Sequence, residues 1–102
     1  MLETAAQGFA AMGSEARLDV LRVLVRAGTP GLTVGEIQSR TGLAPSTLAH
    51  HLRFLAAADL VAQEKVGRAT YNSARFAELQ ALADFILSEC CADADRKAAN
   101  DG

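Results

Sequence analysis

Two adjacent thiols, Cys90 and Cys91, are the residues of this sequence best suited to covalent or metal chemistry. The 102 residues contain no other cysteine. A disulfide between neighbouring residues would close almost no chain, so it would restrict the unfolded state little. Thiolates select soft ions, and two of them alone leave a tetrahedral zinc site incomplete. The pair therefore indicates a soft, thiol-seeking ligand rather than a structural disulfide or a zinc site.

A second group of polar side chains follows one face of a predicted helix that runs from Pro45 to about Ala58. Ser46, His50 and Arg53 are spaced i, i+4 and i+7, and Thr47 adds a hydroxyl near the helix start. Hydroxyl and imidazole groups can hydrogen-bond to base edges, and an arginine suits a phosphate. The spacing alone fits equally well a solvated face on which Ser46 and Thr47 cap their own backbone.

The opposite face of the same predicted helix is apolar. Leu48, Leu52 and Leu55 recur there at helical spacing. His51 lies beside the first two of these leucines, so we expect it to be a packed, hydrogen-bonded structural residue. Side chains of neighbouring helical residues point about 100° apart, so His50 and His51 do not converge on a metal.

Periodicity and capping signals predict the elements that must position these residues. Helices are predicted from about Thr4 to Met12, from Glu15 to Ala27 after an N-cap at Ser14, from the capping box Thr33–Glu36 to about Arg40, from Pro45 to about Ala58, and from about Arg75 to Cys91. After Asp59 the period changes, and two strands are predicted, Leu60–Val66 and Ala69–Ser73, around Gly67-Arg68. The sequence thus predicts a mainly α, winged helix-turn-helix domain over residues 1–91 and a flexible polar tail over 92–102.

The tip of the predicted hairpin is basic. Lys65 and Arg68 flank it, where a wing would meet phosphates or the minor groove, although a basic turn is also typical of a solubilising loop. The formal net charge of the chain is −2, yet residues 37–75 hold five basic and two acidic side chains. A modest basic face on an acidic domain suits reversible DNA binding. Arg40 is a further candidate for a backbone contact, whereas we expect Arg17 to serve the fold.

No pattern typical of an enzyme or a membrane protein is evident. The sequence has no phosphate loop or catalytic triad, and a thiol reductase would want Cys-x-x-Cys at a helix N-terminus. The apolar runs are short and interrupted by charged residues, and the N-terminus lacks the basic region of a secretory signal. We therefore expect a cytoplasmic protein that is no enzyme and carries no cofactor.

Two segments give the chain its likeness to a known family. The first reads Phe9-Ala-Ala-Met-Gly-Ser-Glu-Ala-Arg17-Leu-Asp-Val-Leu. The second reads Gly42-Leu-Ala-Pro-Ser-Thr-Leu-Ala-His50-His51-Leu-Arg-Phe-Leu, followed by Asp59-Leu-Val and a hairpin that ends in Tyr71. Over about residues 5–90 the sequence resembles the ArsR/SmtB family of bacterial metal- and metalloid-responsive repressors.

The resemblance implies a homodimer of winged helix-turn-helix subunits, paired through their first and last helices, on a palindromic double-stranded DNA operator. It favours DNA contact by the helix that begins at Pro45 over the solvated-face alternative. Asp59 stands where the family usually has a glycine.

The same resemblance bears on the inducer. One site of the family uses cysteines at the start of the third helix, a region that here reads Leu32-Thr33-Val34-Gly35-Glu36. Another uses histidines on the last helix, and no His follows His51. The pair Cys90-Cys91 resembles that of the family's atypical arsenic sensors, which carry vicinal cysteines at the C-terminus.

Coordination chemistry sets an expected order among trivalent arsenicals. Arsenite or antimonite with full sulfur ligation would want a third cysteine, whereas methylarsenite already carries one carbon. We therefore expect methylarsenite to bind at least as well as arsenite. Two alternatives remain open: a redox or persulfide sensor that uses the same thiols, and a ligand-blind winged-helix protein.

The predicted last helix suggests how capture would reach DNA. Phe76, Leu79, Ala83, Ile86 and Cys90 fall on one stripe, the expected dimer seam, whereas Cys91 points elsewhere. One atom that bridges both sulfurs should pull the helix end out of regular geometry. The two recognition helices would then be spaced differently across the operator.

Overall fold

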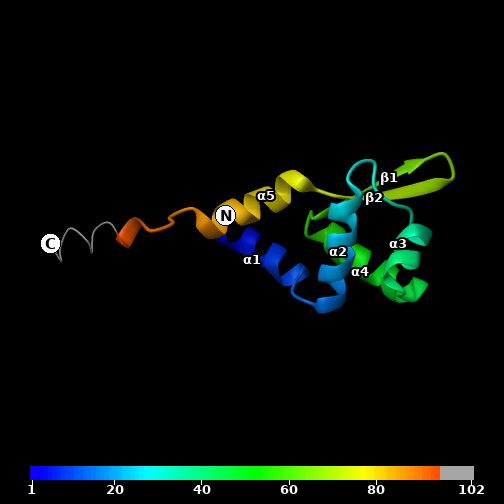
Figure 1. The fold of residues 1–102 in the computed structure, drawn as a ribbon, viewed down its shortest axis with the longest axis horizontal. Coiled ribbons are helices and arrows are strands. Elements are labelled where there is room, and N and C mark those ends of the chain that lie inside the picture. Colours follow the sequence, from blue (N-terminus) through cyan, green and yellow to red (C-terminus); the bar gives the residue numbers. More distant parts are fainter. Residues whose placement is uncertain (95–102) are drawn as a thin grey trace.

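The helices and strands follow one another in the order of a winged helix-turn-helix subunit (Figure 1). The computed structural model describes residues 1–94. Its elements are α1 (Leu2–Ala11), α2 (Glu15–Ala27), α3 (Val34–Thr41), α4 (Pro45–Ala57), β1 (Val61–Val66), β2 (Ala69–Ala74) and α5 (Phe76–Leu87). Strands β1 and β2 form an antiparallel hairpin, the wing. The predicted mainly α fold with a hairpin wing is confirmed.

Local capping chemistry places the starts of three helices where the sequence predicts them. The Ser14 hydroxyl accepts a hydrogen bond from the Arg17 backbone N–H at 3.3 Å, which caps α2. Thr33 and Glu36 cap α3 reciprocally, and Pro45 occupies the first turn of α4. Gly42 ends α3 in the left-handed region, with φ of +75°. The turn between α3 and α4 is therefore set by local sequence.

The core is built from aliphatic side chains of α2, α3, α4 and the segment that leads into β1. Its fully buried members include Val20, Leu24, Ile37, Leu48, Leu52, Leu55 and Leu60. The three leucines of α4 are all on this list, so the apolar stripe predicted for that helix is confirmed. Their burial fixes the rotation of α4 and leaves its polar face in solvent.

Asp59 follows the end of α4 in a left-handed conformation. Its φ is +62°, the region in which glycine is usual and in which Asp is tolerated better than most other residues. An Asp is therefore compatible with the backbone conformation that follows α4. The guanidinium group of Arg75, directly before α5, lies 3.6 Å from the carboxylate of Asp59.

A buried polar contact joins the wing to the loop before α3. Asn72 of β2 is fully buried, and its backbone exchanges hydrogen bonds of 2.8 and 2.7 Å with Leu32. Its side-chain amide also donates to the Leu32 carbonyl, at 3.2 Å, and its side-chain oxygen accepts from Gln63 of β1 at 2.8 Å. Gly31 has φ of +100°, and a Cβ there would collide with the Asn72 carbonyl. This close backbone approach requires glycine.

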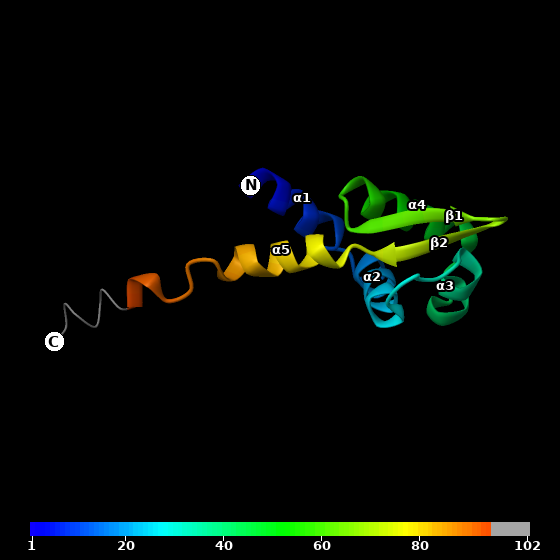
Figure 2. The ribbon, with the colours of Figure 1, turned by 90° about the horizontal axis from the view of Figure 1, so that it is seen from above.

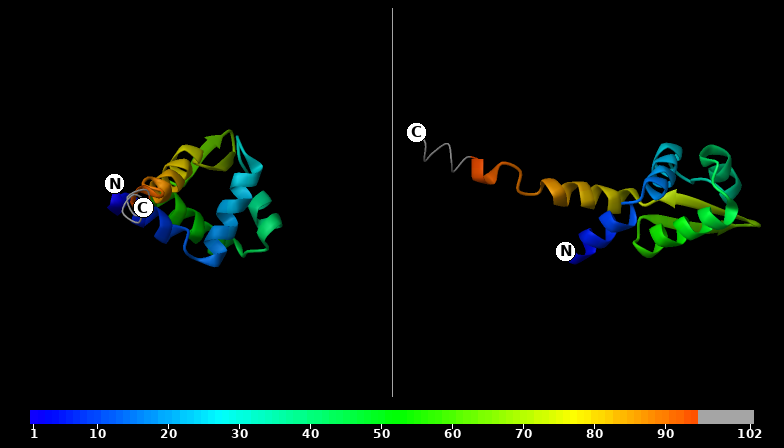
Figure 3. Two further views of the ribbon diagram at one scale, coloured as in Figure 1. Left: turned by 60° about the vertical axis from the view of Figure 1, so that its left-hand side comes forward. Right: turned by 90° about the horizontal axis from the view of Figure 1, so that it is seen from below.

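Helices α1 and α5 lie side by side at the end of the molecule away from the wing tip (Figures 2 and 3). Gly8 of α1 allows the approach, since a Cβ at this position would lie 2.9 Å from Leu82 Cδ1 of α5. Within the described residues, no helix is long and apolar enough to cross a membrane.

Helix α5 is shorter than the sequence suggests. It ends at Leu87 rather than at Cys91, because Ser88 and Cys90 donate backbone hydrogen bonds to carbonyls three residues earlier and Cys91 turns left-handed, with φ of +64°. The continuation of the apolar stripe to Cys90 as part of a regular helix was therefore wrong. Residues 92–94 of the predicted flexible tail are helical, and the rest of that tail lies outside the described residues.

Asn72→Ala should lower the free energy of unfolding by about 1–3 kcal/mol, because it removes a buried hydrogen-bonding side chain and leaves a void beneath the wing. Urea denaturation at fixed pH measures the change. Thr70→Ala, at an exposed position of the same strand nearer the wing tip, is the matched control and should shift stability by less than about 0.5 kcal/mol. Equal losses in the two variants would contradict the role given to Asn72.

Candidate DNA-binding surface and thiol site

The polar side chains predicted on α4 are all exposed. Ser46 and Thr47 lie in its first turn, and His50 and Arg53 follow on the side away from the core leucines. The residue before the helix is Ala44, and no side chain caps this N-terminus. The capping alternative for the two hydroxyls therefore finds no support in the structure. The exposed side of α4 is free of acidic residues along its whole length.

The wing carries its two predicted basic residues in solvent. Lys65 lies at the end of β1 and Arg68 in the turn, and both are exposed. In Figures 1 and 2 the wing tip and the α3–α4 turn lie toward the same end of the molecule, opposite α1 and α5. Arg75 takes no part in this surface, since it lies near the Asp59 and Glu78 carboxylates.

Phe54 is a residue of this surface that the sequence reading did not single out. It is 47% exposed on α4, and the Arg17 guanidinium lies 4.7 Å from its ring centre. Arg17 also donates from Nε to the Ala11 carbonyl at 2.6 Å, so it ties the α1–α2 turn to α4, and its predicted service to the fold is confirmed. The edge of the Phe54 ring meets His50, with ring centres 5.2 Å apart. The only sign of this role in the sequence is that Phe54 is an aromatic residue outside the stripe of core leucines on this helix.

His51 is half-buried beside the core, but its predicted hydrogen bond is absent. Its Nδ1 atom is buried without a partner among the described residues. Burial lowers the pKa of His51 below its ordinary value, and the positive charges of Arg17 and His50 lower this pKa further. The surroundings of the ring therefore disfavour its charged form, without help from a hydrogen bond.

Cys90 and Cys91 form an exposed pair just beyond the end of α5. Their sulfur atoms are 3.4 Å apart. The left-handed backbone of Cys91 belongs to a tight turn in which Cys90 N–H donates to the Leu87 carbonyl at 2.9 Å. Within residues 1–94, no three His, Cys, Asp or Glu side chains gather where they could hold a metal ion. Among the residues that the structure describes, the pair thus offers two sulfur donors and no third protein ligand.

Helix α5 has two apolar faces. Leu79, Leu82 and Phe85 turn toward the subunit's own core. The sequence analysis predicted a single apolar stripe on this helix and did not distinguish this core-facing side. Ile86 and Leu87 are each 64% exposed, and Phe76 is exposed on the same helix. Met1 and Leu2 add exposed apolar side chains on the neighbouring α1. Uncovered apolar surface is therefore present on the first and last helices, whereas Leu79 of the predicted stripe packs against the subunit's own core.

Comparison with known proteins agrees with this architecture. A family model described as a helix-turn-helix domain matches residues 12–64. An ArsR-like transcriptional regulator from Rhodococcus sp. RHA1 is similar in structure, with 31% identity, a TM-score of 0.78, and coverage of 97% of this chain and 90% of that one. The chain belongs to the ArsR family of winged-helix DNA-binding transcriptional regulators.

Two further structures of ArsR-like proteins are similar. One is the homodimeric winged helix-turn-helix DNA-binding domain of a possible ArsR-family regulator from Mycobacterium bovis, with 25% identity, a TM-score of 0.67, and coverage of 86% of this chain and 82% of that one. The other is described as a possible transcriptional regulator for arsenical resistance, with 25% identity, a TM-score of 0.64, and coverage of 92% and 95%. No curated protein sequence matches the chain significantly.

The lowered pKa of His51 predicts a pH dependence of stability. Because this pKa is lower in the folded than in the unfolded chain, the unfolded state binds more protons as the pH falls below about 6.5, and stability falls with it. His51→Gln removes the titrating ring. Urea denaturation at a series of pH values from 7.5 to 5 should therefore show a shallower loss of stability in the variant. Parallel curves would rule out this contribution of His51.

Proposed function

We propose that this ArsR-family chain is a homodimeric repressor that binds a palindromic operator and releases it when a trivalent arsenical is captured by Cys90 and Cys91. The observation that carries the proposal is the exposed pair of sulfur atoms, 3.4 Å apart, next to the helices with uncovered apolar surface. The DNA-binding half rests on the family and on the exposed face of α4.

The surface of α4 and the wing suits a duplex. Ser46 and Thr47 lie at the helix end that enters the major groove in helix-turn-helix docking, where their hydroxyls can serve base edges or phosphates. His50, held by its contact with Phe54, can donate to an acceptor on a base. Arg53 suits a phosphate, and Lys65 and Arg68 suit phosphates or the minor groove beside it.

Pairing of two subunits would put two such surfaces on one operator. The similar Mycobacterium bovis domain is homodimeric. In this chain the exposed Ile86, Leu87 and Leu2 supply apolar surface on the first and last helices, which a second copy would cover. A two-fold axis there would direct both α4 helices to half-sites about 34 Å apart.

The geometry of the thiol pair favours a pyramidal metalloid over zinc. If each sulfur binds one atom at a distance of about 2.3 Å, sulfurs at the observed separation subtend an angle of about 95° at that atom, narrower than the tetrahedral angle of zinc. Trivalent arsenic is pyramidal and three-coordinate. Methylarsenite would exchange its two hydroxyl groups for the two sulfurs and release two waters, and its methyl carbon would complete the coordination. One similar structure is described as a possible regulator for arsenical resistance.

Capture would act on DNA through the end of α5. Both sulfurs lie in a tight turn whose residue Cys91 is left-handed, so closing a ring across them restrains the backbone that follows Leu87. The apolar residues just before this turn, Ile86 and Leu87, belong to the proposed seam. A coupling free energy of about 1–3 kcal/mol between arsenical binding and operator binding would lower DNA affinity about 5- to 150-fold.

Arg53→Ala and Arg68→Ala should each weaken operator binding. Each removes a phosphate contact per subunit, so the slope of log K against log salt should become shallower by about two per dimer. Fluorescence anisotropy of a labelled operator at several salt concentrations measures both effects. Arg22→Ala, an exposed arginine on α2 outside this surface, is the matched control and should change neither. Unchanged binding in both test variants would exclude the assigned surface.

Methylarsenite should release the native chain from its operator, and the Cys90→Ser, Cys91→Ser double variant should bind DNA equally with and without it. Ser88→Ala, in the same turn, keeps both thiols and should respond like the native chain. Arsenite and antimonite, zinc and cadmium complete the titration.

Three outcomes of this titration would count against the proposal. Tight arsenite binding without a methylarsenite response would refute the preference for organic arsenicals. Release by an oxidant or a persulfide donor, without any response to arsenicals, would assign the thiols to redox sensing. A native chain that ignores every compound would be a ligand-blind regulator.

A further inference from the structure

An aromatic side chain on α4 lies outside the core and between two other planar groups. Phe54 is 47% exposed, whereas the leucines of the same helix are buried. The guanidinium carbon of Arg17 lies 4.7 Å from the centre of the Phe54 ring, and the ring centre of His50 lies 5.2 Å from it. Since a half-exposed ring contributes less to the core than a buried one, these two contacts point to a different role for Phe54.

Arg17 is itself held in place. Its Nε donates to the Ala11 carbonyl at 2.6 Å, and Ala11 is the last residue of α1. A planar guanidinium suits the face of an aromatic ring, because the cation is attracted by the negative charge of that face. The contact therefore restrains the Phe54 ring as well as Arg17.

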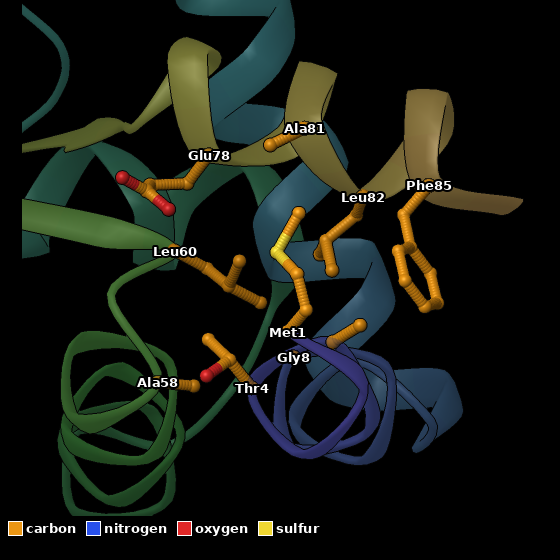
Figure 4. A pocket seen from close by; sticks show the side chains of 10 residues that line it. Met1, Thr4, Gly8, Ala58, Leu60, Glu78, Ala81, Leu82 and Phe85 are labelled. Carbon is orange, nitrogen blue, oxygen red and sulfur yellow. The ribbon is translucent and has the colours of Figure 1, made fainter. Parts of the chain in front are cut away.

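Helix α1 has open space on two sides. Its buried residues, Ala5, Gly8 and Ala11, are all small. A cavity of about 120 Å³ lies between α1 and α5, and Figure 4 shows side chains of both helices around it. An open groove lies between α1 and α4 beside Phe54. The hydrogen bond of Arg17 to Ala11 and its contact with Phe54 therefore tie the end of α1 to α4 across this groove.

The orientation of the His50 ring matters because a neutral imidazole is not symmetric. One ring nitrogen donates a hydrogen bond and the other accepts, so a half-turn of the ring reverses the pattern offered to a base. Rotation about the bond to the ring is soft. Phe54, four residues on, meets His50 with an angle of 68° between the ring planes, and the His51 ring centre lies 6.0 Å from that of His50. These neighbours narrow the orientations of an otherwise exposed side chain.

We propose that Arg17 and Phe54 are positioning residues for base recognition: Arg17 holds the Phe54 ring, which holds His50 in the orientation that meets a base edge. The inference rests on the proposed contact of His50 with DNA and does not involve the thiol pair. Ordering a free side chain at an interface costs about two- to tenfold in affinity. Contacts that order His50 before binding should therefore strengthen binding to the preferred base pair by about this factor.

The test measures how well the chain discriminates between base pairs. Fluorescence anisotropy follows binding to the operator, to operators with one base pair changed in both half-sites, and to an unrelated duplex of equal length. His50→Ala should lose the preference at one position of the half-site. Phe54→Leu should weaken the preference at the same position about two- to tenfold. It should bind the unrelated duplex like the native chain, because the phosphate contacts are unchanged.

Two further variants serve as controls. Phe54→Tyr keeps the aromatic ring and should preserve the native preference at this position. Val25→Ala shortens an apolar side chain on α2 that is 43% exposed, and it should change neither the preference nor the affinity. Equal losses in Phe54→Tyr and Phe54→Leu would refute the role of the ring.

A double-mutant cycle separates positioning from direct contact. If Phe54 acts through His50, the His50→Ala, Phe54→Leu double variant should bind the operator as tightly as His50→Ala alone. Losses that add would mean that Phe54 contacts DNA or supports the fold independently of His50. That result would overturn the proposal.

The part given to Arg17 is tested in the free chain. Arg17→Gln removes the cation from the Phe54 ring, so the NMR signals of the ring protons of both Phe54 and His50 should shift. His50 signals that stay in place in a folded variant would refute the role of Arg17. If Arg17→Gln does not fold, Phe54→Leu still decides, since replacing a half-exposed side chain does not empty the core.

Two kinds of failure can be told apart. If His50→Ala discriminates between base pairs as the native chain does, both the proposed DNA contact of His50 and its positioning are wrong. If His50→Ala loses the preference while Phe54→Leu keeps it in full, the DNA contact of His50 stands and only the positioning role is refuted.

Discussion

The contact between Leu32 and Asn72 determines where the wing stands relative to the recognition helix. The hairpin also packs against α2, α3 and α4 and is connected through the chain to α4 and α5, and this contact adds a buried polar anchor. The buried amide and the paired backbone bonds hold β2 against the loop that begins α3, and Gly31 allows the two backbones to approach closely. Because α3 packs on α4 through the core leucines, the basic wing tip and the polar face of α4 are held in one arrangement by the same core. Buried polar groups are costly unless all of them are paired, so this contact specifies one arrangement of the wing.

Local signals in the sequence predicted much of the fold. Capping by Ser14, Thr33 with Glu36, and Pro45 fixed three helix starts, and the leucine spacing of α4 fixed which face is buried, because both depend on residues a few positions apart. The failures involve residues distant in sequence or backbone conformations without a side-chain signal. The apolar periodicity predicted that α5 continues to Cys91, but the spacing of residues contains no signal for the left-handed turn at that position. His51 was given a hydrogen bond that its neighbours do not provide. The contacts of Phe54 with Arg17, and of Asn72 with Leu32, join segments that only the folded chain brings together.

The segment after α5 and the wing lie at opposite ends of the subunit (Figure 3, right). The connection between them runs through packed helices. Helix α5 meets α1 where Leu82 lies against Gly8, and the same region borders Ala58 and Leu60 at the end of the recognition helix. A displacement of α5 therefore has a short route to α4 within one subunit, besides its effect on the spacing between two subunits. The uncovered apolar residues of α5 and the cavity beneath this helix both lie on that route.

The thiol pair lies after the last core residue of α5, in a turn whose side chains are all exposed. Replacing Glu89, Cys90 or Cys91 disturbs no buried contact. The proposed sensing element is thus modular: other donor sets, such as histidines or a longer run of cysteines, could be placed at this position without repacking the domain. Ligand specificity and operator specificity can accordingly be engineered independently on this scaffold.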